Sequence, residues 1–135
     1  MEAIHSDAAP AAIGPYAQAV RCGDLIFTSG QIALTADGRF VDDSVSAETQ
    51  QVMHNLEQVL QAAGCALGCV VKTTIFLTDM GDFAAVNEVY AAAMGDHRPA
   101  RATVAVAALP RGARVEIECI ASAVNCGDGE SAPCC

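Results

Sequence analysis

Residues 97–119 read HRPARATVAVAALPRGARVEIEC, and the fold is decided in this stretch. The apolar run from Ala102 to Leu109 predicts one strand, and the segment from Arg114 to Ala123 predicts a second strand after a Pro-Arg-Gly turn. In the second strand charged and apolar residues alternate, so Glu116 and Glu118 project from the same face. This stretch therefore predicts two consecutive strands joined by a short turn, and one face of the second strand is polar.

Upstream of this stretch, the spacing of apolar residues is helical in two places. Residues 44–63 carry an apolar stripe at helical spacing, and a second amphipathic helix ends at Gly95. Between the two helices, the β-branched segment Val70–Leu77 predicts a strand. Before the first helix, two extended runs flank a Gly-Asp turn and predict a hairpin: Tyr16–Arg21 and Leu25–Ser29.

The predicted order of elements is β-β-α-β-α-β-β, with one further short strand considered between Ala33 and Val41. This order is typical of the α+β class, with a mixed β-sheet and two helices packed on one face. Residues 1–12 are interpreted as a loose lead-in. Residues 1–123 are expected to form a single domain, followed at 124–135 by a flexible tail that contains cysteines.

The composition of the 135-residue chain predicts a light core. Its apolar fraction is 53%, but 27 of the apolar residues are alanine. Val, Ile, Leu and Phe together make up about 23% of the chain, just above the roughly 20% below which disorder is the usual interpretation. The second face of the sheet also needs cover, so burial against other subunits is expected.

The charge of the chain argues against a role in binding nucleic acid. Seven Lys and Arg stand against 16 Asp and Glu, the formal net charge is −9, and no basic run occurs. No apolar stretch reaches about 18 residues, so no membrane span is predicted. The N-terminal residues show no secretory signal or typical transit peptide, which favours a cytoplasmic location and leaves an organellar one open.

Neither a metal site nor a cofactor site is predicted. The seven cysteines are an odd number, and without a secretory signal they are expected to be reduced thiols. Cys65 and Cys69 are four residues apart, but no nearby pair completes a zinc set, and His5, His54 and His97 stand far apart. Glycine-rich nucleotide loops and the Gly-x-Ser-x-Gly motif are absent from the sequence.

One arginine and the two glutamates of the last strand are candidates for chemistry, and each has two interpretations. Arg101 opens an otherwise apolar strand, where it is either exposed to solvent or grips a carboxylate with two parallel hydrogen bonds. The two glutamates, Glu116 and Glu118, either form a polar strand face, or a carboxylate there lies near a bound anionic substrate and positions a water molecule or moves a proton. The Gly-Pro-Tyr segment at 14–16 and the Ser-Gly pair at 29–30 are either turn residues or points where backbone approaches a ligand.

Taken together, these segments resemble the RidA/YjgF family, whose members are also labelled L-PSP endoribonucleases. The resemblance runs from about Ile13 to Ala123, in the family's order and spacing. The segments that carry it are Gly14–Ala19 (GPYAQA), Ser29–Ile32 (SGQI), Asn87–Tyr90 (NEVY), Pro99–Val104 (PARATV), Leu109–Pro110 and Val115–Ala121 (VEIECIA). It implies a chorismate-mutase-like α+β fold assembled as a homotrimer, with three sites in clefts between subunits.

The resemblance also implies an enzymatic activity. Family members hydrolyse reactive 2-imino acids such as 2-iminobutanoate and 2-iminopropanoate, or their enamine tautomers, to 2-keto acids and ammonia, without cofactor or metal. Two alternatives go with the family: an endoribonuclease or translation inhibitor, and a chaperone-like binding protein. The net charge of −9 argues against the first alternative.

Residue roles follow from the same resemblance. Arg101 matches the arginine that holds the substrate carboxylate, and Glu116 matches the glutamate that positions or activates water. Thr103 stands where many members carry cysteine, at a position used largely through its backbone, so activity should survive this departure. The remaining matches are pocket residues or lie near the cleft: Tyr16, Ser29, Gly30 and Asn87.

Overall fold

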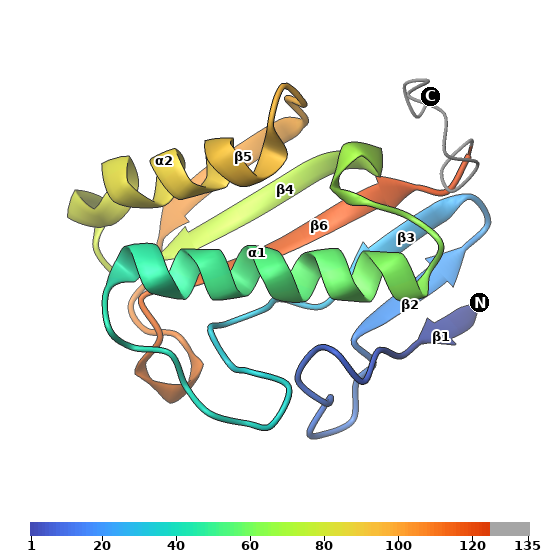
Figure 1. Cartoon of the computed structure of the whole chain (residues 1–135), viewed down its shortest axis with the longest axis horizontal. Helices are drawn as coiled ribbons and strands as arrows, with labels where there is room; N and C mark the ends of the chain where they lie inside the picture. The colour runs from blue at the N-terminus through green and yellow to red at the C-terminus, as the bar shows by residue number, and fades with distance from the viewer. Residues whose placement is uncertain (125–135) are drawn as a thin grey trace.

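Two helices cover one face of a mixed β-sheet (Figure 1). The computed structural model describes residues 1–124, so the predicted tail lies outside the described residues apart from Val124. Helix α1 spans Val45–Ala62 and helix α2 spans Phe83–Met94. The predicted α+β class, with both helices on one face, is confirmed.

The sheet has six strands in the order β1-β2-β3-β6-β4-β5. Among the strands of the described residues, β4 and β5 pair in parallel, and the other neighbours are antiparallel. Short 3-10 turns precede β4 and α2 and also precede β6. The strands are β1 (Glu2–Ile4), β2 (Ala19–Cys22), β3 (Leu25–Thr28), β4 (Val70–Leu77), β5 (Ala100–Ala105) and β6 (Val115–Ser122).

The prediction of a loose lead-in over residues 1–12 was wrong. Glu2–Ile4 pairs with β2 and forms one edge of the sheet, so its backbone groups are satisfied there. Buried Gln18 holds the segment that follows, because its Nε2 donates to the carbonyls of Ser6 at 3.1 Å and Pro10 at 2.7 Å. The short strand considered near Ala33–Val41 is reduced to an isolated bridge between Leu34 and Phe40.

Strand β5 begins and ends earlier than the predicted Ala102–Leu109. Within residues 1–124 it is an edge strand paired with β4 alone, and their last pair joins Ala105 to Leu77. The backbone N–H of Val106 still donates to the carbonyl of Leu77 at 2.7 Å, and beyond it residues 107–109 meet no strand among the described residues. The length of β5 is therefore set by its neighbour.

The core lies between the helices and the sheet face that they cover. Its largest fully buried side chains come from both layers: Ile26, Leu56, Leu60, Ile75, Leu77 and Ile117. On the opposite face, Leu25, Phe27 and Val104 stay 39%, 37% and 41% exposed. Within the described chain no helix covers this face (Figure 1).

An ion pair between a buried glutamate and a partly exposed arginine fixes the start of β6 against α1. Ser44 caps α1, and its hydroxyl accepts from the backbone N–H of Ala47 at 3.0 Å. One turn further on, Glu48 is 1% exposed and accepts from both the backbone N–H (3.0 Å) and Nε of Arg114. Glu116, two residues beyond Arg114, is thereby held in a fixed register.

The cysteines do not all follow the prediction of reduced thiols. Cys22, Cys65 and Cys119 are free, and burial raises the pKa of the Cys119 thiol to about 12. Cys69 is disulfide-bonded, so the prediction was wrong at that position. Over residues 1–124, no helix has the length and apolarity to cross a bilayer, and no group of three or more His, Cys, Asp or Glu is arranged to hold a metal.

Candidate functional site

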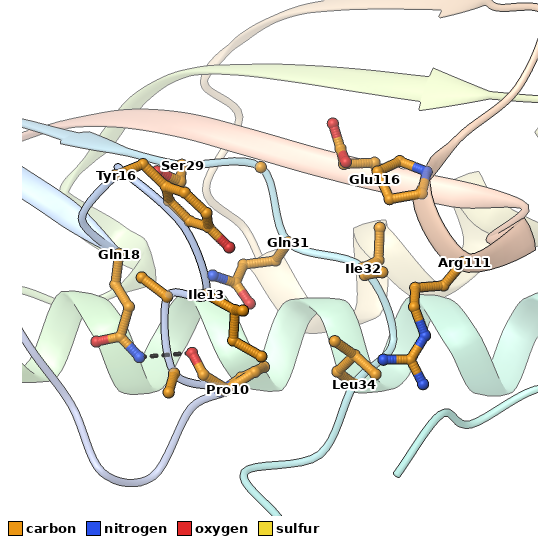
Figure 2. A pocket seen from close by; sticks show the side chains of 14 residues that line it. Pro10, Ile13, Tyr16, Gln18, Ser29, Gln31, Ile32, Leu34, Arg111 and Glu116 are labelled. Carbon is orange, nitrogen blue, oxygen red and sulfur yellow. Dashed lines mark hydrogen bonds between the residues drawn. The ribbon is translucent and has the colours of Figure 1, made fainter. Parts of the chain in front are cut away.

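Four of the predicted site residues line one hollow of about 570 Å³: Tyr16, Ser29, Gly30 and Glu116. In Figure 2, Tyr16 and Gln18 lie on one side of this hollow, and Glu116 and Arg111 on the other. Much of the remaining wall is apolar, with Pro10, Ile13, Ile32 and Leu34 among its residues. Glu116 therefore lies in the same hollow as the glycine, the serine and the tyrosine.

Gly30 and Glu116 are in close contact because backbone bonds hold their strands together. Gln31 and Ile117 exchange two hydrogen bonds, at 2.9 and 3.1 Å, in an antiparallel bridge, so the residues before them, Gly30 and Glu116, lie diagonally across it on the same face. A Cβ at Gly30 would lie 2.6 Å from Oε2 of Glu116 and 2.8 Å from its Cδ. Glycine is required here by the carboxylate, since no turn with positive φ occurs at this position.

The environment of Glu116 changes its acidity. The side chain is half-buried, and burial raises the pKa of its carboxyl above the ordinary value, with the negative charge of Glu118 raising it further. A carboxylate with a raised pKa is a better proton acceptor near neutral pH. Glu116 therefore has the properties expected of a general base.

The two hydroxyl groups of this hollow differ in what they can offer a ligand. The Ser29 hydroxyl donates to the carbonyl of Ala17 at 2.5 Å, so its proton is already engaged and its oxygen remains as an acceptor. Tyr16 is 55% exposed. Its hydroxyl can therefore either donate a hydrogen bond to a ligand or accept one from it.

Arg101 lies in a different hollow, of about 530 Å³, beside α2. Its Nη1 donates to Oδ1 of Asn87 at 2.7 Å, and the guanidinium lies 5.1 Å from the ring centroid of Tyr90 and 5.6 Å from that of Phe83. The Tyr90 hydroxyl is in turn bonded to the hydroxyl of Thr73 at 2.9 Å. The guanidinium is thus oriented from one side, and its other N–H groups are available to an anion.

Within one chain, Arg101 and Glu116 point to opposite faces of the sheet. Through β4, Arg101 shares a row with buried Cys119, and Glu116 shares a row with exposed Val104. Residues in one row across a sheet project to the same face, so Arg101 projects to the helix-covered face and Glu116 to the uncovered face. The structure does not bring these two predicted residues together in a single chain.

Thr103 follows Arg101 by two residues and shares its face of β5. Its hydroxyl oxygen is buried and has no hydrogen-bond partner within the described residues. A buried hydroxyl without a partner costs stability unless a ligand or a neighbouring chain satisfies it.

The family model described as Endoribonuclease L-PSP matches residues 6–123. A mouse protein named 2-iminobutanoate/2-iminopropanoate deaminase is 51% identical over 119 residues, which cover 87% of this chain and 88% of that protein. The chain belongs to the RidA/YjgF family. Another RidA/YjgF relative, the Arabidopsis thaliana protein named Reactive Intermediate Deaminase A, chloroplastic, is 48% identical over 122 residues, or 90% of this chain and 65% of that protein.

Solved structures show the same RidA/YjgF fold. The structure of E. coli TdcF with bound serine has a TM-score of 0.86 and 39% sequence identity, and the match covers 90% of this chain and 98% of that one. Names within the family are not uniform: some relatives are named deaminases, and others are named RutC family proteins or putative endoribonucleases.

Sequence reasoning about this RidA/YjgF chain missed two arginines. Arg111 lines the hollow of Glu116 and adopts a left-handed conformation with φ 61° and ψ 19°. Arg98 lines the hollow of Arg101. The first was visible only as part of a Pro-Arg-Gly turn, and the second only as a neighbour of Pro99, so neither carried a signal of its own.

Proposed function

We propose that this protein hydrolyses reactive 2-imino acids, such as 2-iminobutanoate and 2-iminopropanoate, and their enamine tautomers to 2-keto acids and ammonia. The observation that carries the proposal is the half-buried Glu116 carboxylate, held against Gly30 in a hollow and raised in pKa by burial. The deaminase names of relatives at about half sequence identity support the same reaction class. We place the activity in the cytoplasm.

A complete site in this proposal needs two chains. Arg101 and Glu116 project from opposite faces of one sheet, so the Arg101 edge of one chain must meet the Glu116 hollow of another. Such an interface joins two different surfaces, and heterologous contacts of this kind form a ring when the rotation between neighbours closes. A homotrimer with three sites between subunits satisfies this geometry and covers apolar side chains such as Phe27 and Val104.

The chemistry requires little beyond orientation, because a protonated imine carbon is already electrophilic. Arg101 holds the substrate carboxylate with two hydrogen bonds, and Glu116 accepts a proton from the water molecule that attacks the imine carbon. The resulting carbinolamine takes that proton back on its nitrogen. The carbon–nitrogen bond then breaks, ammonia leaves, and the hydroxyl becomes the ketone after losing its proton.

The hydroxyl groups of the hollow assist in different ways. Tyr16 is free to donate to the substrate or to the attacking water. Ser29 acts as an acceptor, because its proton is committed to the Ala17 carbonyl. Since the imine carbon needs no further activation, the proposed reaction uses no cofactor.

Mixing two inactive variants tests the function and the shared site together. Arg101→Ala and Glu116→Ala should each abolish accelerated hydrolysis of 2-iminobutanoate, because one removes the carboxylate clamp and the other removes the base. In randomly mixed trimers, about a quarter of the sites combine an intact arginine with an intact glutamate from neighbouring chains. Co-refolding the two variants should therefore restore roughly a quarter of the wild-type rate.

The outcomes of this experiment separate the two parts of the proposal. A wild-type rate in either single variant removes that residue from the mechanism. Inactive single variants without recovery on mixing contradict a site shared between chains. Sedimentation of each variant confirms that the assembly itself is intact. The endoribonuclease alternative is ruled out if RNA fails to bind even at low salt.

A further inference from the structure

The hollow that contains Arg101 is positively charged in an otherwise acidic protein. Two of the chain's seven Lys and Arg residues, Arg98 and Arg101, line it, whereas the whole chain has a net charge of −9. Among the described residues, no carboxylate lines this hollow; its other walls are Asn87, Tyr90, Ala91 and Pro99. Two guanidinium groups without a neutralising acid make a local anion site.

Helix α2 places no acidic side chain in the wall of this hollow. Asn87, Tyr90 and Ala91 are spaced three and four residues apart, so they share the helix face that lines the hollow. Glu88 lies on another face and lines the groove between α1 and α2. Asp96, the acidic residue nearest to Arg98 in sequence, is exposed and is not part of the hollow wall.

Arg98 is held in place by the backbone that follows α2. Its Nη1 donates to the carbonyls of Gly95 at 2.5 Å and His97 at 2.9 Å. The His97 ring is itself bonded to the carbonyl of Val70 at 2.6 Å, which ties this segment to β4. Nη1 is therefore committed, while Nε and Nη2 keep their N–H groups for a ligand. A guanidinium fixed in this way loses little freedom on binding.

We propose that Arg98 forms a second anion subsite beside Arg101, which takes 2-imino acids whose side chain carries a second carboxylate. The proposal rests on the proposed function, in which Arg101 holds the carboxylate next to the imine carbon. The second carboxylate then meets the free N–H groups of Arg98. Substrates with an apolar side chain do not use Arg98 and are hydrolysed without it.

A comparison of two substrates in matched variants tests this subsite. The substrates are 2-iminoglutarate and 2-iminobutanoate, each generated in situ by an amino-acid oxidase. Their rate of hydrolysis is measured by competition with semicarbazide, which traps the imine that remains. Arg98→Gln should lower kcat/KM for 2-iminoglutarate about fivefold or more, which is the loss expected for one charged hydrogen bond near the surface. The same substitution should leave kcat/KM for 2-iminobutanoate unchanged. Arg39→Gln, the same charge change at an exposed turn residue outside both hollows, should alter neither value.

Binding of stable products separates this inference from the catalytic proposal. Calorimetry should show 2-oxoglutarate binding more tightly than 2-oxobutanoate to the wild type, with the difference lost in Arg98→Gln and partly kept in Arg98→Lys. Equal effects of Arg98→Gln on both ligands, or no effect on either, would overturn the subsite. If the wild type fails to hydrolyse 2-iminobutanoate, the proposed function falls, and the binding measurements still decide the role of Arg98.

Discussion

Replacing Gly30 by alanine should damage the site while leaving the fold intact. The added Cβ would lie 2.6 Å from Oε2 of Glu116, whereas ordinary contact begins at 3.4 Å. The carboxylate must therefore retreat by about 0.8 Å, and a misplacement near 1 Å in a catalytic group costs about 100-fold in rate. We expect kcat/KM for 2-iminobutanoate to fall roughly 10- to 100-fold in Gly30→Ala.

The cost in stability should be small, because the atoms that clash belong to the end of a flexible side chain. We expect the free energy of unfolding to fall by about 1 kcal/mol, the lower end of the range for overpacked sites. Thermal unfolding measures this separately from the semicarbazide-competition assay of imine lifetime. In a Glu116→Ala background the same glycine substitution should cost no stability, since no carboxylate remains to be displaced.

Gly68→Ala is the matched control for this experiment. A Cβ at Gly68 meets nothing within 4 Å, and the residue has no positive φ. Wild-type kinetics in Gly30→Ala, or an equal loss in Gly68→Ala, would refute the argument that close packing against Gly30 sets the position of the carboxylate.

Two other substitutions follow from the charged residues. Burial raises the pKa of Glu116 above that of the unfolded chain, so its ionisation destabilises the fold as pH rises through the raised pKa. Glu116→Gln should therefore raise Tm at pH 8 and leave it unchanged at a pH below 4, and a gain that persists in acid would contradict this cause. Arg114→Ala removes the guanidinium from buried Glu48 and leaves it only the backbone N–H of residue 114, so chemical denaturation should show a loss of about 2 kcal/mol. Arg39→Ala, at an exposed position, should lose less than about 0.5 kcal/mol; an equal loss would mean that the ion pair does not hold β6 to α1.

The elements that were predicted well are those decided by residues close together in sequence. Helix α1 was expected over residues 44–63 and spans Val45–Ala62, because its apolar stripe repeats every three or four residues. Strand β1 was missed because three residues cannot show an alternating pattern. Its existence depends on pairing with β2, a contact between segments about 17 residues apart.

The candidate site was predicted as a set of residues but not as an arrangement. The face to which Arg101 or Glu116 projects depends on the register of its strand against β4. Strand β5, which carries Arg101, pairs with β4 in parallel, and β6, which carries Glu116, pairs with it antiparallel. The sequence spacing between the residues of β5 and those of β6 does not indicate that Arg101 and Glu116 project to opposite faces. Gly30 was likewise predicted as a pocket residue, but the reason for a glycine there, a carboxylate within 2.6 Å of a Cβ, depends on the tertiary contact.

The placement of Arg101 and Glu116 on opposite sides of one sheet has a consequence for mixed populations of chains. In the proposed ring, each copy lends its arginine to one neighbour and its glutamate to the other. A copy that lacks either the arginine or the glutamate inactivates one site. A copy that lacks both inactivates two sites, and at each of them the other catalytic residue comes from an intact chain. In a mixture with intact chains, a doubly defective copy therefore lowers the activity by more than its share of the population.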